Sequence, residues 1–219
     1  MNFVNTFDQL VNIAQIVRKC PTITLSRAFT AAYRDFANQS QYLRLSVAGV
    51  TVADQRQYSL GNDPYLDIIG INGMQASQVI NGNTQFWAVN PSDGSLWDPN
   101  FSSNASTTMP VRYQYIPQAQ FALDPIPKGV FDLLVGVIVQ PKEGADQVPQ
   151  SALLKYASDI EAGALAYLLD IPGQPWTNPA LAMKYAGAFR SGISNAKADV
   201  QRSFNVGSVR ARPRRFLVG

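Results

Sequence analysis

Apolar residues follow a helical period at both ends of the chain and an alternating period in the middle. Near the start they recur four and three positions apart, which predicts a helix with a narrow apolar seam formed by Phe3, Phe7, Leu10, Ala14 and Val17. Thr6 and Gln9 have the spacing of a capping box, so Thr6 is expected to cap this helix. A second helix is predicted from Thr24, with an apolar face made of Leu25, Ala28, Ala32 and Phe36.

The middle of the chain predicts short strands. Leu43, Leu45 and Val47 alternate with polar neighbours, which is typical of a strand with one wet face. Further strands are predicted over residues 56–60, 65–71, 85–89, 111–116, 121–123 and 130–139, separated by turn signals such as Asn72-Gly73. This spacing indicates an antiparallel sandwich or small barrel. Residues 131–139 are apolar on both faces apart from Asp132 and Gly136, which predicts that this strand lies at the centre of the sheet.

The last third returns to a helical period. Leu153, Ala157, Ile160, Ala164 and Leu168 fall on one face of a helix that must end before Pro172, because proline cannot continue it. Asn178 and Pro179 then have the signature of an N-cap and a first helical residue. The helical pattern continues from there to about Phe204, so the two helices are expected to form an antiparallel hairpin.

These patterns predict an α+β fold, in which the N- and C-terminal helix pairs form a four-helix bundle and an antiparallel β-sandwich or barrel is inserted between them. The expected parts are the N-terminal helix pair (1–40), the β-rich lobe (41–148), the C-terminal helix pair (149–205) and an extended basic C-terminal arm (206–219).

Positive charge is concentrated in that arm. The 219-residue chain has a net charge of +3, and no acidic residue follows Asp199, whereas five arginines do. The remainder of the chain is therefore net negative. Gly207 and Pro213 prevent a regular helix, while Val209 and Phe216 are apolar anchors that a purely electrostatic tail would not need. Charge and pattern alone leave two interpretations, a frayed basic terminus or an arm that inserts into another protein.

The sequence offers little for catalysis. It contains no histidine, and its one cysteine, Cys20, follows two cations that could lower its pKa but has no histidine to act as its base. Asp93 and Asp98 flank Trp97 as a glycosidase pair would, yet both have the sequence context of turns and loops. Residues 70–73 are glycine-containing but lack a phosphate-loop Lys-Ser/Thr pair. We therefore predict no catalytic, cofactor-binding or metal-binding residues, and no cofactor.

Aromatic residues in the middle leave a second function open. Tyr58, Trp87 and their neighbours could stack carbohydrate or single-stranded nucleic acid on a β-sandwich binding module, with the basic tail adding phosphate contacts. Residues 41–150 are net acidic, which disfavours nucleic acid. The chain has no run of eighteen apolar residues and no secretory signal pattern, so no membrane contact is expected.

The C-terminal third also resembles a known family. Four segments in order resemble the head-to-tail adaptor (connector) proteins of tailed bacteriophages. They are residues 163–169, the linker from Pro172 to Pro179, the long helix ending at Phe204-Asn205, and the run from Arg210 to Phe216. The resemblance is strong over residues 150–216 and weak over the middle.

The resemblance implies a structural, non-enzymatic virion protein, assembled in the host cytoplasm and present as a ring of about a dozen copies beneath the portal. Its expected partners are the portal, tail tube, nozzle or fibre-attaching proteins, other copies of itself, and genomic DNA in transient contact. By the same resemblance, the portal-binding residues would be Phe204, Asn205, Val209, Arg210, Arg212, Pro213, Arg214, Arg215 and Phe216.

Overall fold

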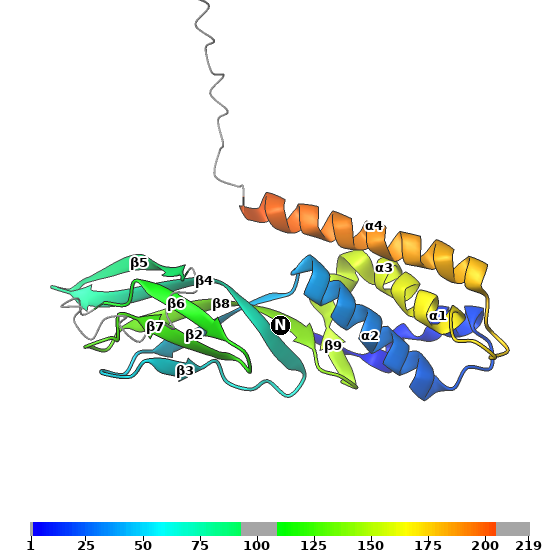
Figure 1. Cartoon of the computed structure of the whole chain (residues 1–219), viewed down its shortest axis with the longest axis horizontal. Coiled ribbons are helices and arrows are strands. Elements are labelled where there is room, and N and C mark those ends of the chain that lie inside the picture. The colour runs from blue at the N-terminus through cyan, green and yellow to red at the C-terminus, as the bar shows by residue number, and fades with distance from the viewer. Residues whose placement is uncertain (1, 93–108, 205–219) are drawn as a thin grey trace, which may run out of the picture.

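The helices and the main sheet occupy opposite ends of the molecule (Figure 1). This computed structural model describes residues 2–92 and 109–204. The helical end contains a 3₁₀ helix, Thr6–Gln9, and four α-helices: α1 (Val11–Ile16), α2 (Thr22–Ser40), α3 (Gln150–Leu169) and α4 (Pro179–Phe204). Buried apolar residues from helices and sheet form one continuous core, and α2 packs directly against strand β8 (Asp132–Pro141).

The main sheet has seven strands and is curled. Its order is β2-β8-β4-β5-β6-β7-β3, and every neighbouring pair is antiparallel except β5 with β6. Besides β8, its strands are β2 (Arg44–Val50), β3 (Gln57–Ser59), β4 (Leu66–Ile80), β5 (Asn83–Pro91), β6 (Arg112–Ile116) and β7 (Gln120–Asp124). Two further strands, β1 (Phe3–Asn5) and β9 (Gln147–Pro149), form a separate antiparallel pair.

The predicted four-helix bundle is wrong. Only α2, α3 and α4 are long, and α1 has six residues. The first predicted helix fails because Phe3–Asn5 pairs with β9, and Thr6 bonds to the loop before that strand. The Thr6 N–H donates to Asp146 O at 2.8 Å, and its hydroxyl donates to Ala145 O at 3.1 Å. Thr6 is therefore not a cap, and the overall class α+β fits only in part.

Helix α2 forms where its apolar face predicts, although it begins at Thr22 rather than at Thr24. Leu25, Phe29, Ala32, Tyr33 and Phe36 are buried along one stripe of the helix. The Tyr33 hydroxyl donates to Pro149 O at 2.5 Å, which joins the centre of α2 to the segment that leads into α3.

Helices α3 and α4 confirm the predicted hairpin. α4 begins at Pro179, and Asn178 Oδ1 accepts a hydrogen bond from the Leu181 N–H at 3.1 Å, so Asn178 is the cap as expected. The last residue of α4 is Phe204.

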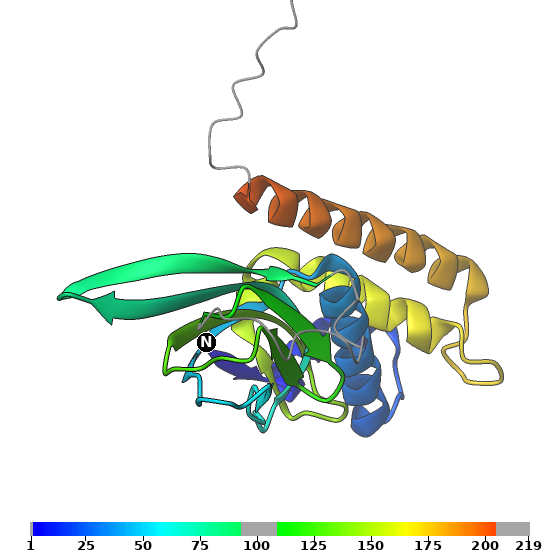
Figure 2. The ribbon, with the colours of Figure 1, turned by 60° about the vertical axis from the view of Figure 1, so that its left-hand side comes forward.

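The sheet corrects two predictions. Asn72-Gly73 is not a turn, because β4 runs through it with register shifts between Ile68 and Gly70 and between Ile71 and Gly73. The turn is at Asn81-Gly82, where both residues have positive φ, as a two-residue hairpin of type I′ requires. β8 lies between β2 and β4, so it is an interior strand but the second in the order rather than the central one. The resulting β4–β5 hairpin projects beyond the other strands (Figure 2).

Candidate functional site

The predicted site residues begin where the described structure ends. Phe204 is the last residue of α4. Asn205, Val209, Arg210, Arg212, Pro213, Arg214, Arg215 and Phe216 lie outside the described residues. The described residues next to this segment are the last turns of α4 and the surface of α3 that contacts them.

Small residues bring α4 very close to α3. A Cβ atom on Gly163 of α3 would lie 2.7 Å from Cδ2 of Phe189, and one on Gly192 of α4 would lie 2.4 Å from Cβ of Asp159. Both distances are shorter than non-bonded carbon atoms tolerate, so each contact requires glycine. Ala182, Phe189, Ile193 and Ala196 of α4 are buried at this interface. The direction of α4 is therefore set by its close contact with α3.

A polar cluster then fixes the last turns of α4. Asp199 accepts hydrogen bonds from the Lys155 ammonium group and from the Tyr156 hydroxyl, both on α3. Arg202, one turn further along α4, lies 3.8 Å from the other Asp199 oxygen. This cluster links the start of α3 to the residues just before the basic segment.

Tyr156 occupies an unusual position within α3. Its backbone angles, φ −120° and ψ 20°, are not helical and mark a kink. Its ring centroid lies 5.3 Å from that of Phe36 and 5.2 Å from that of Tyr42. The ring is therefore packed between Phe36 of α2 and Tyr42, two positions before β2, while the hydroxyl donates to Asp199.

The charges of this cluster stabilise one another. Hydrogen bonds from Lys155 and Tyr156 lower the pKa of Asp199 below its ordinary value, and the bond to Asp199 raises the pKa of Lys155. Burial, reinforced by Asp199, raises the pKa of Tyr156 to about 12. At neutral pH, Asp199 is therefore ionised, Lys155 is charged and Tyr156 keeps its proton.

A shallow hollow of about 440 Å³ lies beside the cluster, lined by Tyr42, Arg44, Lys155, Asp199, Val200 and Ser203. The cluster was missed in the sequence because Lys155 and Asp199 are 44 positions apart. The only available signal was the predicted hairpin, which makes the start of α3 and the end of α4 neighbours.

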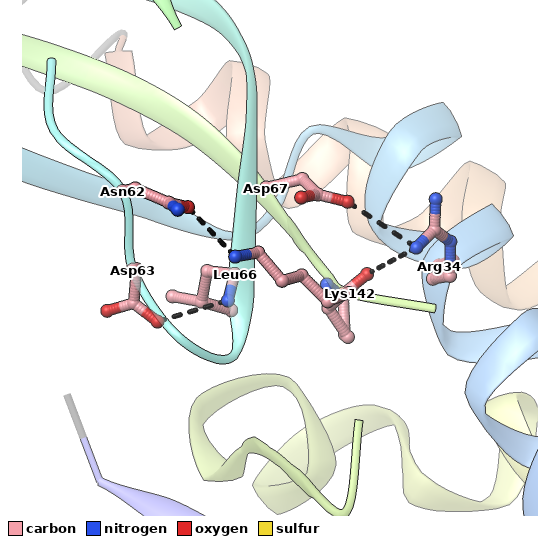
Figure 3. Close-up of polar contacts among 7 residues, drawn as sticks. Arg34, Asn62, Asp63, Leu66, Asp67 and Lys142 are labelled. Carbon is pink, nitrogen blue, oxygen red and sulfur yellow. Dashed lines mark hydrogen bonds and ion pairs between the residues drawn. The ribbon is translucent and has the colours of Figure 1, made fainter. Parts of the chain in front are cut away.

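A second group of polar contacts joins the helices to the sheet (Figure 3). Arg34 of α2 lies 3.5 Å from the Asp67 carboxylate on β4 and donates to Pro141 O of β8 at 3.1 Å. The Lys142 ammonium group donates to Asn62 Oδ1 at 2.8 Å. Asp63 accepts hydrogen bonds from the backbone N–H groups of Tyr65 and Leu66, which closes the turn before β4. The Arg34 contacts join the helical end to the sheet, whereas the Lys142 and Asp63 bonds fix the loop before β4 to the end of β8 and to itself.

A hollow of about 870 Å³ adjoins this junction. Its charged lining residues are Arg27, Arg34, Asp35 and Glu143. Arg34 and Asp35 already have partners, because Arg34 contacts Asp67 and Asp35 accepts a hydrogen bond from Tyr167 at 2.8 Å.

The candidates for chemistry do not form a site. Burial raises the pKa of the Cys20 thiol, so the expected lowering by adjacent cations is wrong. Within residues 2–92 and 109–204, no group of three or more His, Cys, Asp or Glu residues could hold a metal. Asp93, Trp97 and Asp98 lie outside the described residues. No helix in the described part of the chain is long and apolar enough to cross a bilayer.

Most aromatic residues of the sheet are used in packing. Tyr58 stacks on Phe121 with ring centroids 5.3 Å apart, Trp87 meets Phe131 edge to face at 5.5 Å, and Tyr113 is buried. Phe86 is exposed. Among the described residues the sheet therefore presents no row of open rings of the kind that stacks sugars or bases.

Comparison with known families agrees with the resemblance found in the sequence. The SU10 adaptor protein family matches residues 6–214, which includes both long C-terminal helices, the sheet and most of the basic segment. A search among curated proteins finds no match. Because the family match covers nearly the whole chain, this protein belongs to the SU10 adaptor protein family, a family of phage head-to-tail adaptors.

Proposed function

We propose that this chain is a ring component of the head–tail junction of a tailed phage, with about a dozen copies lying beneath the portal. The family is one of structural adaptors, so its task is assembly. In this proposal, the segment after Phe204 docks into the portal, and the β-rich end faces tail tube, nozzle or fibre-attaching proteins. The host cytoplasm is the place of assembly, and packaged DNA passes through the ring.

The observation that carries the proposal is the family match over residues 6–214, combined with a firmly held α4 directly before the basic segment. Asp199 is bonded to Lys155 and Tyr156 only five positions before Phe204. A segment that leaves a fixed helix end starts from a defined place, so less of its freedom is lost on docking.

The segment itself combines charge with apolar anchors. Arg210, Arg212, Arg214 and Arg215 can pair with carboxylates on a partner, and Val209 and Phe216 can fill apolar sites. We expect the apolar residues to contribute much of the affinity, because exposed ion pairs each contribute only about 0–1 kcal/mol.

The test is attachment to portal-bearing heads that lack adaptor. Deletion of residues 206–219 should leave the circular dichroism spectrum and the unfolding midpoint unchanged, and should abolish co-sedimentation with heads. A variant with Phe216→Ser and Val209→Ser should also bind weakly, while retaining every charge. Equal recovery of the truncated and full-length chains on heads would refute docking through this segment.

Salt dependence separates this proposal from nucleic-acid binding. Affinity for nucleic acid falls steeply with salt because counterions are released, whereas an apolar segment in a protein groove responds weakly. Attachment to heads should therefore persist between low and moderate salt.

A further inference from the structure

Four neighbouring strands present an exposed apolar face at the free end of the sheet. Val50 of β2 is paired with Asp132 of β8, which is paired with Ser77 of β4, which is paired with Phe86 of β5. Side chains alternate between the two faces of a strand, so these four lie on one face. The opposite face carries Leu133, Val135, Met74 and Ala76, which are buried in the core.

The outer face is unusually apolar for a surface in contact with water. Val50 is 55% exposed, Leu134 47%, Val79 62% and Phe86 63%, and the exposed Ala48 and Ala88 lie between them. Val52 and Val130, which flank the ends of β2 and β8, are also exposed. We call this surface the outer apolar face. A contiguous exposed patch of this kind marks a protein interface.

Both edges of the four-strand block are open within the described part of the chain. β2 pairs only with β8, and β5 pairs with β6 only at Asn90 and Pro91, so β5 has an unpaired outer edge over residues 83–89. Natural edge strands are usually guarded against pairing by charged residues. β5 contains no charged residue, and β2 contains none after Arg44.

The directions of the strands make the two edges complementary to each other. β2, β8, β4 and β5 are successively antiparallel, so β2 and β5 run in opposite directions. A second copy placed with its β2 beside β5 of the first copy would therefore continue the sheet in antiparallel fashion, without turning the block over. Its outer apolar face would lie on the same side.

We propose that β5 of one copy pairs with β2 of the next, so that a continuous sheet runs between neighbouring subunits. The proposal rests on the proposed ring and adds the surface through which its copies meet. Because two different edges are joined, the contact is heterologous, and a heterologous contact repeated with rotation closes a ring.

The side chains at the two edges suit this pairing. In registers that keep the outer face on one side, Phe86 at one edge would meet Ser46, Ala48, Val50 or Val52 at the other. Aromatic and β-branched residues are favourable cross-strand neighbours. In the segments of the four strands that carry the outer apolar face (47–50, 74–80, 83–89 and 132–135), Asp132 is the only charged residue. Pairing of two copies therefore brings no like charges together along these edges.

The experiment places one cysteine on each edge. Full-length chain with Cys20→Ser, Val50→Cys and Thr84→Cys is bound to portal-bearing heads and treated with a short bismaleimide cross-linker. Neighbouring cross-strand side chains lie within about 5–8 Å of one another, which is within reach of the linker. We expect a ladder of covalently joined chains, and no ladder from either single-cysteine variant.

A substitution series provides an independent measurement. Phe86→Lys should reduce the number of bound copies per head about tenfold, which corresponds to about 1.4 kcal/mol, while Phe86→Leu should retain them. Met183→Lys is the matched control, because Met183 is an exposed apolar residue on α4, away from the sheet. It should bind as the unmodified chain does.

Two failures can be told apart. If heads carry many copies of the chain but the double-cysteine variant yields no ladder, or if Phe86→Lys binds normally, then the strand pairing is wrong and the ring stands. If the unmodified chain does not bind heads at all, the proposed function fails, and the pairing fails with it.

Discussion

The glycine contact between α3 and α4 supports a quantitative prediction about stability. Gly163 lies within α3, and a Cβ added there would lie 2.7–3.0 Å from three ring carbons of Phe189. Gly187 lies within α4, and a Cβ added there would meet nothing within 4 Å. Replacement by alanine is therefore the same chemical change at both positions, but it creates a steric conflict only at Gly163.

The expected values follow from two effects. Alanine is favoured over glycine in a helix by about 1 kcal/mol, and this gain applies to both positions. Overpacking a tight core costs about 1–3 kcal/mol, and this cost applies only to Gly163, because the ring of Phe189 is held at the interface. Gly187→Ala should therefore stabilise the protein by about 1 kcal/mol, and Gly163→Ala should be less stable than Gly187→Ala by about 1–3 kcal/mol.

Urea unfolding measures this difference. The midpoints of the two variants should move apart while the slope of free energy against urea stays constant, which shows that only stability has changed. Adding Phe189→Leu to Gly163→Ala should recover part of the loss, because the two positions are coupled. If both alanine variants were stabilised equally, the close approach of α3 and α4 would be refuted.

Two further predictions concern contacts that hold the helices in place. The pKa of Asp199 is lower in the folded chain than its unfolded value of about 3.9, so the ionised carboxylate stabilises the fold at pH values above about 3.9. This stabilisation should disappear as pH falls through the folded pKa. The difference in urea midpoint between the unmodified chain and Asp199→Asn should therefore be larger at pH 7 than at pH 3. An equal difference at both pH values would contradict the role of the ionised carboxylate. Tyr33→Phe removes the hydrogen bond to the buried Pro149 carbonyl and should cost about 1–3 kcal/mol in urea unfolding, whereas Tyr185→Phe, in a partly exposed position on α4, should cost less.

Local signals were sufficient for the α3–α4 hairpin. Asn178 and Pro179 start α4 through a side-chain cap and a missing N–H group, and both effects depend only on adjacent residues. The family was also identifiable from this region, and the match over residues 6–214 confirms it.

Distant contacts decided the first part of the chain. The spacing of Phe3, Phe7 and Leu10 is helical, yet Phe3 is in a strand because it pairs with Pro149, 146 positions away. A periodic pattern contains no information about such a partner. Thr6 likewise bonds to Ala145 and Asp146 instead of capping a helix.

The sheet shows how one pattern can have two meanings. Residues 131–139 are apolar on both faces apart from Asp132 and Gly136, which predicted a central strand, but Leu134 is exposed on the outer apolar face. Asn72-Gly73 and Asn81-Gly82 are the same dipeptide, and only the second is a turn. The first lies where β4 must continue to remain paired with β8, and this long-range requirement is not visible in local sequence. The location of the portal-binding residues after Phe204 remains a prediction.

The pairing of β1 with β9 affects when the protein can fold. β1 precedes α2 and β9 follows the β-rich segment, so this pair can form only after residues 147–149 have been made. The helices α3 and α4, which pack against α2, are made later still. Folding that depends on such distant contacts is slow, and the apolar stripe of α2 remains uncovered during synthesis. The buried face of α2 is therefore covered only after residues 150–204 have been synthesised.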